Sequence, residues 1–110
     1  MKNDRRAGSE RRTDERVPAD VEIEWEGMIG KKIGVIRDIT THGCFILCSG
    51  EVEDGETVKV YFPLNDGRQI QFWGEVSNHV FEIGFALKFI ELTDPQTEFL
   101  EFFVDTLREK

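Results

Sequence analysis

Three arginines and a short segment containing an acid, a hydroxyl and a glycine are the residues of this chain best suited to binding a ligand. Residues 11–16 read RRTDER, and residues 38–43 read DITTHG. A guanidinium group donates paired hydrogen bonds that suit phosphate oxygens and the O6/N7 edge of guanine. A carboxylate suits the donor-bearing N1/N2 edge of the same base. Brought together, the two segments would form a pocket for a small anionic guanine nucleotide, lined by Arg11, Arg12, Arg16, Asp38, Thr40 and Gly43.

Each of these residues also has a structural interpretation. The arginines could form a solvated basic stretch paired with Asp14 and Glu15. Asp and Thr commonly cap turns, and Gly43 could supply a positive φ angle. Three arginines without a lysine favour directed, forked contacts. From the residues alone both interpretations stay open.

Metal binding and catalysis find little support in the sequence. Cys44 and Cys48 are four residues apart on one expected strand, which separates them by about 13 Å. This is beyond the reach of a disulfide, and a straight strand cannot bring both thiols to one tetrahedral zinc ion. We therefore expect reduced thiols that pack as small hydrophobic groups. His42, near Asp38 and Thr40, has neither an activated nucleophile nor an oxyanion hole beside it, so no catalytic and no metal-binding residue is predicted.

Length and charge narrow the class of protein. A chain of 110 residues with 39% hydrophobic residues can build one domain with a modest core. The net charge of −8 argues against binding to DNA, RNA or an anionic membrane. Residues 1–18 nevertheless carry a net charge of +2, and we expect residues 1–10 to be a flexible basic arm. No apolar run is long enough to span a bilayer or to form a signal core, so we expect a cytoplasmic protein.

Alternation of apolar and polar residues predicts six short strands between residues 17 and 91. Ser77 and Asn78 are expected to separate the fifth strand from the sixth. Trp73 falls on the polar face of its strand and is a candidate stacking residue. Strands at this spacing, joined by short turns, predict an all-β fold: an antiparallel sheet that closes or nearly closes.

The last part of the chain changes to helical periodicity. Thr93, Asp94 and Pro95 provide a helix start signal, and apolar residues recur near 3.6-residue spacing up to Leu107. We expect a helix over about residues 94–108 whose phenylalanines plug or flank the barrel. Their abundance leaves open that part of this face binds a partner.

The two motifs together resemble those of the PilZ domain family of bacterial cyclic di-GMP receptors. RRTDER matches the family's RRxxxR, and DITTHG matches its (D/N)xSxxG with Thr40 in the serine position. The resemblance covers about residues 10–108, and the whole domain would span residues 11–110. It implies a six-stranded antiparallel barrel of Greek-key or split type with a C-terminal helix, and an N-terminal segment that folds over the open side.

The resemblance also implies a role for each site residue. Arg12 and Arg16 would hold guanine edges and phosphates, and Arg11 would add a phosphate contact or stack on a base. Asp38 would accept hydrogen bonds from a guanine, while Thr40 and Gly43 would supply a hydroxyl and a close backbone approach. The β-methyl of Thr40 could crowd the base, so we expect weakened or unchanged binding. We therefore expect a stand-alone sensor that uses no cofactor. Cyclic di-GMP would order the N-terminal arm, and an effector protein would recognise the new surface.

Two other classes of function remain as alternatives. The chain could be a ligand-independent PilZ-like adaptor that binds another protein through its helix and barrel surface. It could also be a small oligonucleotide-binding barrel, which the acidic body disfavours.

Overall fold

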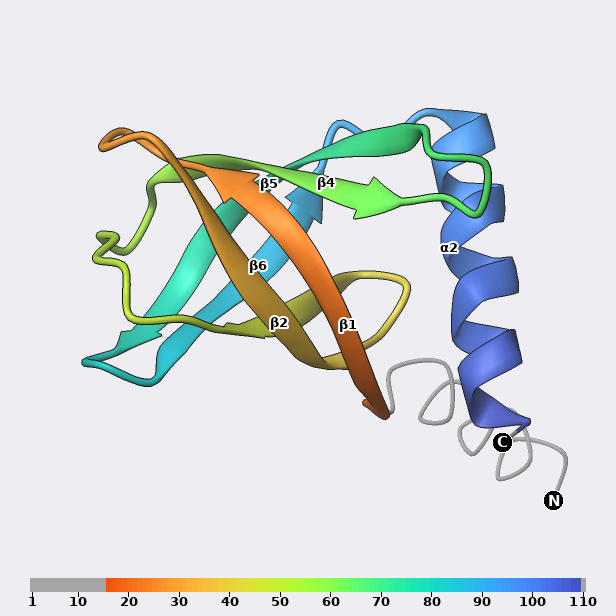
Figure 1. Ribbon diagram of the computed structural model, residues 1–110, viewed down its shortest axis with the longest axis horizontal. Helices are drawn as coiled ribbons and strands as arrows, with labels where there is room; N and C mark the ends of the chain where they lie inside the picture. The colour runs from red at the N-terminus through yellow and green to blue at the C-terminus, as the bar shows by residue number, and fades with distance from the viewer. Residues whose placement is uncertain (1–15, 110) are drawn as a thin grey trace, which may run out of the picture.

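The computed structural model describes residues 16–109, which form a closed antiparallel barrel of six strands followed by one helix (Figure 1). The strands follow the order β1-β2-β3-β6-β5-β4 around the barrel, and β4 pairs with β1 to close it. The predicted all-β fold with a C-terminal helix is therefore confirmed. The elements are β1 (Val17–Glu26), β2 (Lys31–Ile39), β3 (Gly43–Leu47), β4 (Thr57–Pro63), β5 (Gln69–Val80), β6 (Gly84–Ile90) and α2 (Asp94–Arg108).

The inward-facing positions of the strands build one apolar core. Trp25 and Phe85 pack edge to face with ring centroids 5.0 Å apart, and Phe62 and Phe72 do so at 5.1 Å. Such pairs contribute about 0.5–1.5 kcal/mol beyond the burial of their area. Among residues 16–109 every buried residue with a side chain is apolar, so the interior of the barrel offers no polar site. Any polar site among these residues must lie on the outside or at the ends.

Three irregularities in strand register change which side chains face outward. Arg37 is an extra residue between the pairs Ile36–Ile46 and Asp38–Phe45, and Ser77 is an extra residue between two pairs of β5 with β6. A third shift lies in β1 between Pro18 and Val21. A bulged residue breaks the in–out alternation, so the residues that follow it exchange faces.

The bulge at Ser77 corrects the predicted end of β5. Ser77 and Asn78 do not form the turn before the last strand, because β5 continues through them to Val80. The turn lies at residues 81–83 instead. In the sequence, two consecutive polar residues resemble a turn. Here Ser77 and Asn78 both face outward because the bulge interrupts the in–out alternation of the strand.

The helix α2 lies across one end of the barrel (Figure 1). It begins with a capping box in which the Thr93 hydroxyl accepts from the Gln96 backbone N–H and the Gln96 side chain accepts from the Thr93 N–H. Phe99 and Phe103 pack edge to face on Phe62, with centroids 5.9 and 5.6 Å away. The phenylalanines of the helix thus cover the barrel end as expected, apart from Phe102, which is 71% exposed. No helix among residues 16–109 combines the length and apolarity needed to cross a membrane.

Candidate functional site

The turn between β2 and β3 is organised by the hydroxyl of Thr40. Its oxygen accepts hydrogen bonds from the backbone N–H groups of His42, at 2.9 Å, and Gly43, at 3.2 Å. The Thr40 N–H in turn donates to the Gly43 carbonyl at 2.8 Å. These bonds occupy both acceptor positions of the hydroxyl and leave its O–H free to donate. The remaining capacity suits an acceptor such as a phosphate oxygen or a base carbonyl.

Asp38 joins the two motifs. Because Arg37 is bulged, Asp38 points out of the barrel and Ile39 points into the core. The Asp38 carboxylate accepts from Nη1 of Arg16 at 2.8 Å and from Nε of Arg37 at 3.3 Å. Its side chain is 15% exposed, whereas that of Arg16 is 57% exposed. The carboxylate therefore holds one end of Arg16 in place while much of the guanidinium stays open to a ligand.

Gly43 is required by the packing of the barrel. A Cβ at this position would lie 2.2 Å from the Leu87 carbonyl oxygen of the neighbouring strand, closer than real contacts allow. Gly43 pairs with Lys88 across the β3–β6 ladder, so this close approach belongs to the sheet itself. The glycine consequently has a structural reason that holds with or without a ligand.

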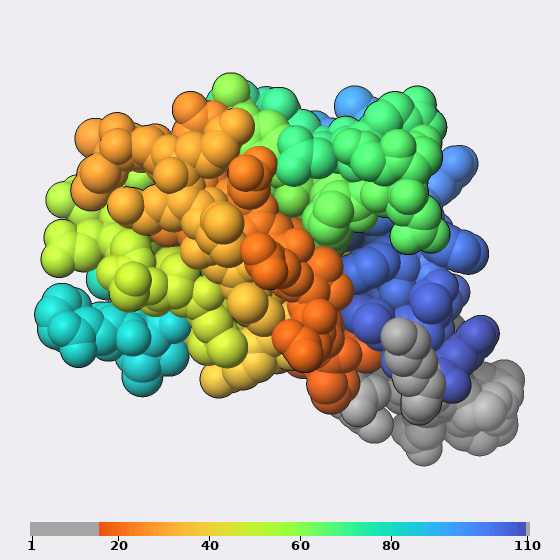
Figure 2. Space-filling model, viewed as in Figure 1, coloured from red at the N-terminus to blue at the C-terminus, as the bar shows by residue number. Residues whose placement is uncertain are grey.

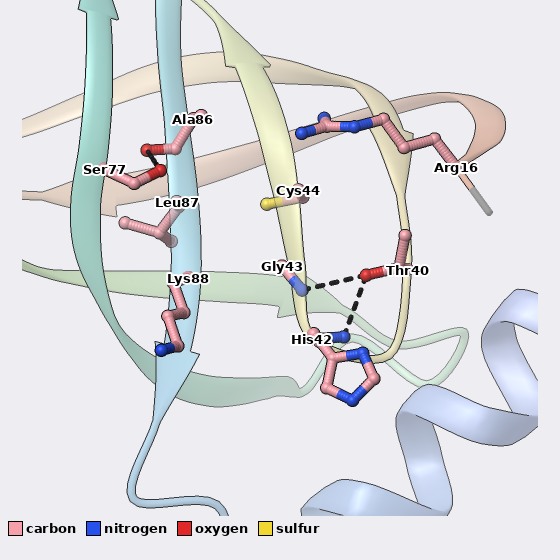
Figure 3. Close-up of a pocket in the computed structure, with 9 residues that line it drawn as sticks. All are labelled: Arg16, Thr40, His42, Gly43, Cys44, Ser77, Ala86, Leu87 and Lys88. Carbon is pink, nitrogen blue, oxygen red and sulfur yellow. Dashed lines mark hydrogen bonds between the residues drawn. The ribbon is translucent and has the colours of Figure 1, made fainter. Parts of the chain in front are cut away.

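Three of these residues, Arg16, Thr40 and Gly43, border an open cavity of about 310 Å³ (Figure 3). Arg16, Thr40 and Gly43 lie on one side, together with His42. The other side comes from β5 and β6. Figure 3 shows Arg16 and Lys88 at opposite edges of the cavity, with Cys44 between them. The lining residues are Arg16, Thr40, His42, Gly43, Cys44, Ser77, Ala86, Leu87 and Lys88.

Of the six predicted site residues, the structure describes four. It brings Arg16, Thr40 and Gly43 to one cavity, and Asp38 to Arg16 beside it. Arg11 and Arg12 lie outside the described residues. Arg16, the last residue of the first motif, thus meets the second motif at Asp38, 22 residues further along the chain.

Ser77 and Lys88 line the cavity but were not predicted from the sequence. Lys88 is exposed and forms no ion pair with any residue between 16 and 109. In the sequence, Lys88 could have been noticed as the single cation among the apolar residues of the last strand, at an outward-facing position. Ser77 could have been found only through the bulge it forms. Arg16 and Arg37 place two positive charges on Asp38, and Lys88 adds a third at the cavity that Arg16 borders, in a chain whose net charge is −8.

Cys44 is a buried, free thiol at the base of the cavity. Burial raises its pKa strongly, the nearby Asp38 charge adds to this, and Arg16 opposes it. A neutral thiol is a weak nucleophile and a poor metal ligand. The cysteines are free as predicted, and no group of three or more potential metal ligands gathers within residues 16–109.

Comparisons with known proteins bear on the family and the fold of this chain. The family model for the PilZ domain matches residues 10–105. No curated protein is similar enough in sequence to match.

Solved structures share the fold at low sequence identity. The PilZ domain of CeSA from a cellulose-synthesizing bacterium has a TM-score of 0.65 and 19% identity, covering 86% of this chain and 98% of that one. The Bacillus subtilis inhibitor of motility (MotI/DgrA) has a TM-score of 0.71 and 14% identity, covering 86% and 49%. Borreliella burgdorferi PlzA, solved in complex with c-di-GMP, has a TM-score of 0.68 and 15% identity, covering 92% and 44%. The chain thus spans about half of the last two proteins and nearly all of the first.

Proposed function

Because this chain belongs to the PilZ domain family, we propose that it is a cyclic di-GMP receptor that binds the dinucleotide through residues 11–16 and 38–43. The observation that carries the proposal is the meeting of the two motifs. Arg16 forms an ion pair with Asp38 and borders the same cavity as Thr40 and Gly43. The related fold of PlzA, which holds this dinucleotide, supports the choice of ligand.

Each described residue offers chemistry that the ligand needs. The exposed part of the Arg16 guanidinium can donate to a phosphate or to a guanine edge. Asp38 can accept from the N1 and N2 donors of guanine, and the free O–H of Thr40 can donate to an acceptor on the ligand. Arg11 and Arg12 would complete the phosphate contacts from outside the described residues. The receptor has no catalytic role in this proposal.

Binding would be relayed to an effector protein in the cytoplasm by the segment that precedes Arg16. The dinucleotide carries two phosphates, which would neutralise the arginines and bring residues 1–15 against the barrel. The ordered segment would then present a surface that the effector recognises.

Calorimetric titration with cyclic di-GMP tests the binding. We expect heat of binding for the wild type and at least a tenfold loss of affinity in Arg12→Ala and in Arg16→Ala. Arg68→Ala is a matched control, because Arg68 also pairs with an aspartate, Asp66 at 2.7 Å, but does not line the cavity. The proposal would be disproved if the folded wild type gave no heat of binding. It would also be disproved if Arg12→Ala and Arg16→Ala bound cyclic di-GMP with the same affinity as Arg68→Ala.

The proposed ordering of residues 1–15 on binding is tested separately. Backbone amide NMR spectra with and without the dinucleotide report on residues 1–15 directly. Ordering predicts new shifts and raised heteronuclear NOE values for this segment on binding. Unchanged values with a saturated site would reject the relay and leave the binding intact.

A further inference from the structure

The barrel end opposite α2 is formed by three turns, residues 27–30, 48–56 and 81–83, which we call the distal end (Figure 1). Glu56 connects two of them, because its carboxylate accepts from the N–H of Met28 at 2.8 Å and from that of Glu53 at 3.0 Å. The Cys48 N–H donates to the Ile83 carbonyl at 3.0 Å and connects the third. The three turns are therefore held together by hydrogen bonds before any partner arrives.

Large apolar side chains are exposed at this end. Met28 is 83% exposed, Ile29 69%, Phe81 67% and Ile83 50%. With Val80 they make up five of the eight exposed large hydrophobic residues between 16 and 109. Met28 and Ile29 also border a cavity of about 320 Å³, whose other side is formed by residues 51–53, Glu56 and His79. A concentration of exposed apolar groups next to a hollow is typical of an interaction site.

The charge of the distal end identifies the kind of partner. Its turns contain Glu51, Glu53, Asp54 and Glu82 besides Glu56, whereas its cations are Lys31 and Lys32 at the start of β2, where the Lys32 side chain lies against Gly50. Five acids against two lysines leave this end acidic. None of the first four acids forms an ion pair with any residue between 16 and 109. Figure 2 shows the three turns together at one end of the molecule.

We propose that the distal end docks a basic, amphipathic segment of another protein. Apolar anchors of that segment would contact Ile29 and Phe81, and its lysines or arginines would face Glu51, Glu53, Asp54 and Glu82. Nucleic acid and anionic membranes are repelled by this charge. A second copy would place the same acids against each other in a two-fold contact. The chain's own basic residues 1–10 contain no bulky apolar residue except Met1 that could serve as an anchor.

The cavity at the distal end shares no lining residue with the nucleotide cavity, which is built from Arg16, the β2–β3 turn, β3, β5 and β6. Docking there does not require cyclic di-GMP, so it is tested without it. Failure of this proposal would consequently leave the nucleotide proposal untouched.

A phage-displayed library of random sixteen-residue peptides, selected on the full chain, provides the probe. We expect enriched peptides with a net positive charge and at least two large apolar residues. Fluorescence anisotropy should show at least a tenfold weaker affinity for the double variant Ile29→Ser/Phe81→Ser and for Glu51→Lys/Glu53→Lys. Phe102→Ser, which removes an equally exposed phenylalanine from α2, should bind as the wild type does.

Several results would overturn the proposal. They are the absence of any enriched sequence, enrichment of neutral or acidic peptides, and equal affinity of the wild type and both distal variants. Sedimentation that shows a dimer dispersed by Ile29→Ser/Phe81→Ser would assign the surface to a second copy instead. All substituted side chains are exposed or lie in turns, and circular dichroism melts verify that the variants fold.

Discussion

Thr40 shapes the β2–β3 turn and lines the cavity proposed to bind the ligand. Its oxygen accepts the two N–H groups that shape the β2–β3 turn, and its hydrogen remains available. Serine would keep these bonds without the β-methyl, which restricts χ1 and narrows the space beside the turn. The hydroxyl, rather than the particular residue, is therefore what the turn requires.

Replacing Thr40 separates these roles. We expect Thr40→Ser to bind cyclic di-GMP as tightly as the wild type or more tightly. Thr40→Val, of nearly equal size, should lower the free energy of unfolding by about 1 kcal/mol and weaken binding about tenfold, because two N–H groups lose their acceptor and the ligand loses a donor. Urea denaturation and calorimetry measure the two effects. Equal behaviour of the serine and valine variants would contradict this account.

Cys44 should lower the free energy of unfolding of this protein at alkaline pH. Burial raises its pKa above the ordinary value of 9.0, so the folded state keeps a proton that the unfolded state loses. The thiol costs no stability below pH 9, and above it stability falls by up to about 1.4 kcal/mol per pH unit.

We therefore expect the wild type to lose about 1 kcal/mol more than Cys44→Ala between pH 9 and pH 10. Chemical denaturation at several pH values provides the measurement. The half-buried Cys48 has a raised pKa too, mainly through burial, and Cys48→Ala serves as the comparison. Parallel curves for the wild type and Cys44→Ala would rule out the thiol as the cause.

Among the secondary-structure elements, the strands position the site through their irregularities. The bulge at Arg37 turns Asp38 toward Arg16, and the bulge at Ser77 places that residue at the cavity. Regular alternation would have pointed Asp38 into an apolar core, where an unpaired carboxylate is very costly. Bulges are common beside functional sites for this reason.

The helix depends on its first turn. Thr93 and Gln96 cap it, and Nε2 of Gln96 also donates to the Gln71 carbonyl of β5 at 2.7 Å. We expect Thr93→Ala to lower the free energy of unfolding by about 1 kcal/mol. Thr106→Ala in the same helix removes only a bond to the Phe102 carbonyl and should have little effect. Thermal melts of both variants compare them, and similar losses would show that the cap does not matter.

The sequence predicted the local features of this molecule better than the non-local ones. Alternation revealed six strands, and both motifs are continuous, so Asp38 and Thr40 could be found without a structure. Ser77 and Lys88 reach the cavity only through the pairing of β3, β6 and β5, which no short segment encodes. The outward position of Phe102 was missed because helical spacing gives a wide apolar stripe, whereas the barrel end covers a narrower one.

For the whole molecule, the distribution of charge matters more than its sum. A net charge of −8 repels anions, yet Arg16, Arg37 and Lys88 gather at one side. Lys88 faces the cavity from the strand opposite Arg16, so phosphates bound there would have a cation on each side. This local field would compete with the repulsion of the acidic body.

Removing Lys88 tests this arrangement. We expect Lys88→Ala to weaken cyclic di-GMP binding several-fold at low salt and to reduce the dependence of affinity on salt, because exposed charges are screened within about 10 Å at 0.1 M. Lys59→Ala is the control, since Lys59 lies over the Trp73 ring and not at the cavity. Calorimetry at about 50 and 300 mM salt decides, and identical slopes for both variants would exclude the role.

Closure of the sheet has a consequence for how such a protein can change. Within residues 16–109 every strand has two neighbours, so the barrel has no edge strand. Turns at one end can lengthen, shorten or acquire new side chains without unzipping the ladder or disturbing the other end. The residues of the candidate ligand cavity and those of the distal end can thus change in sequence independently of each other.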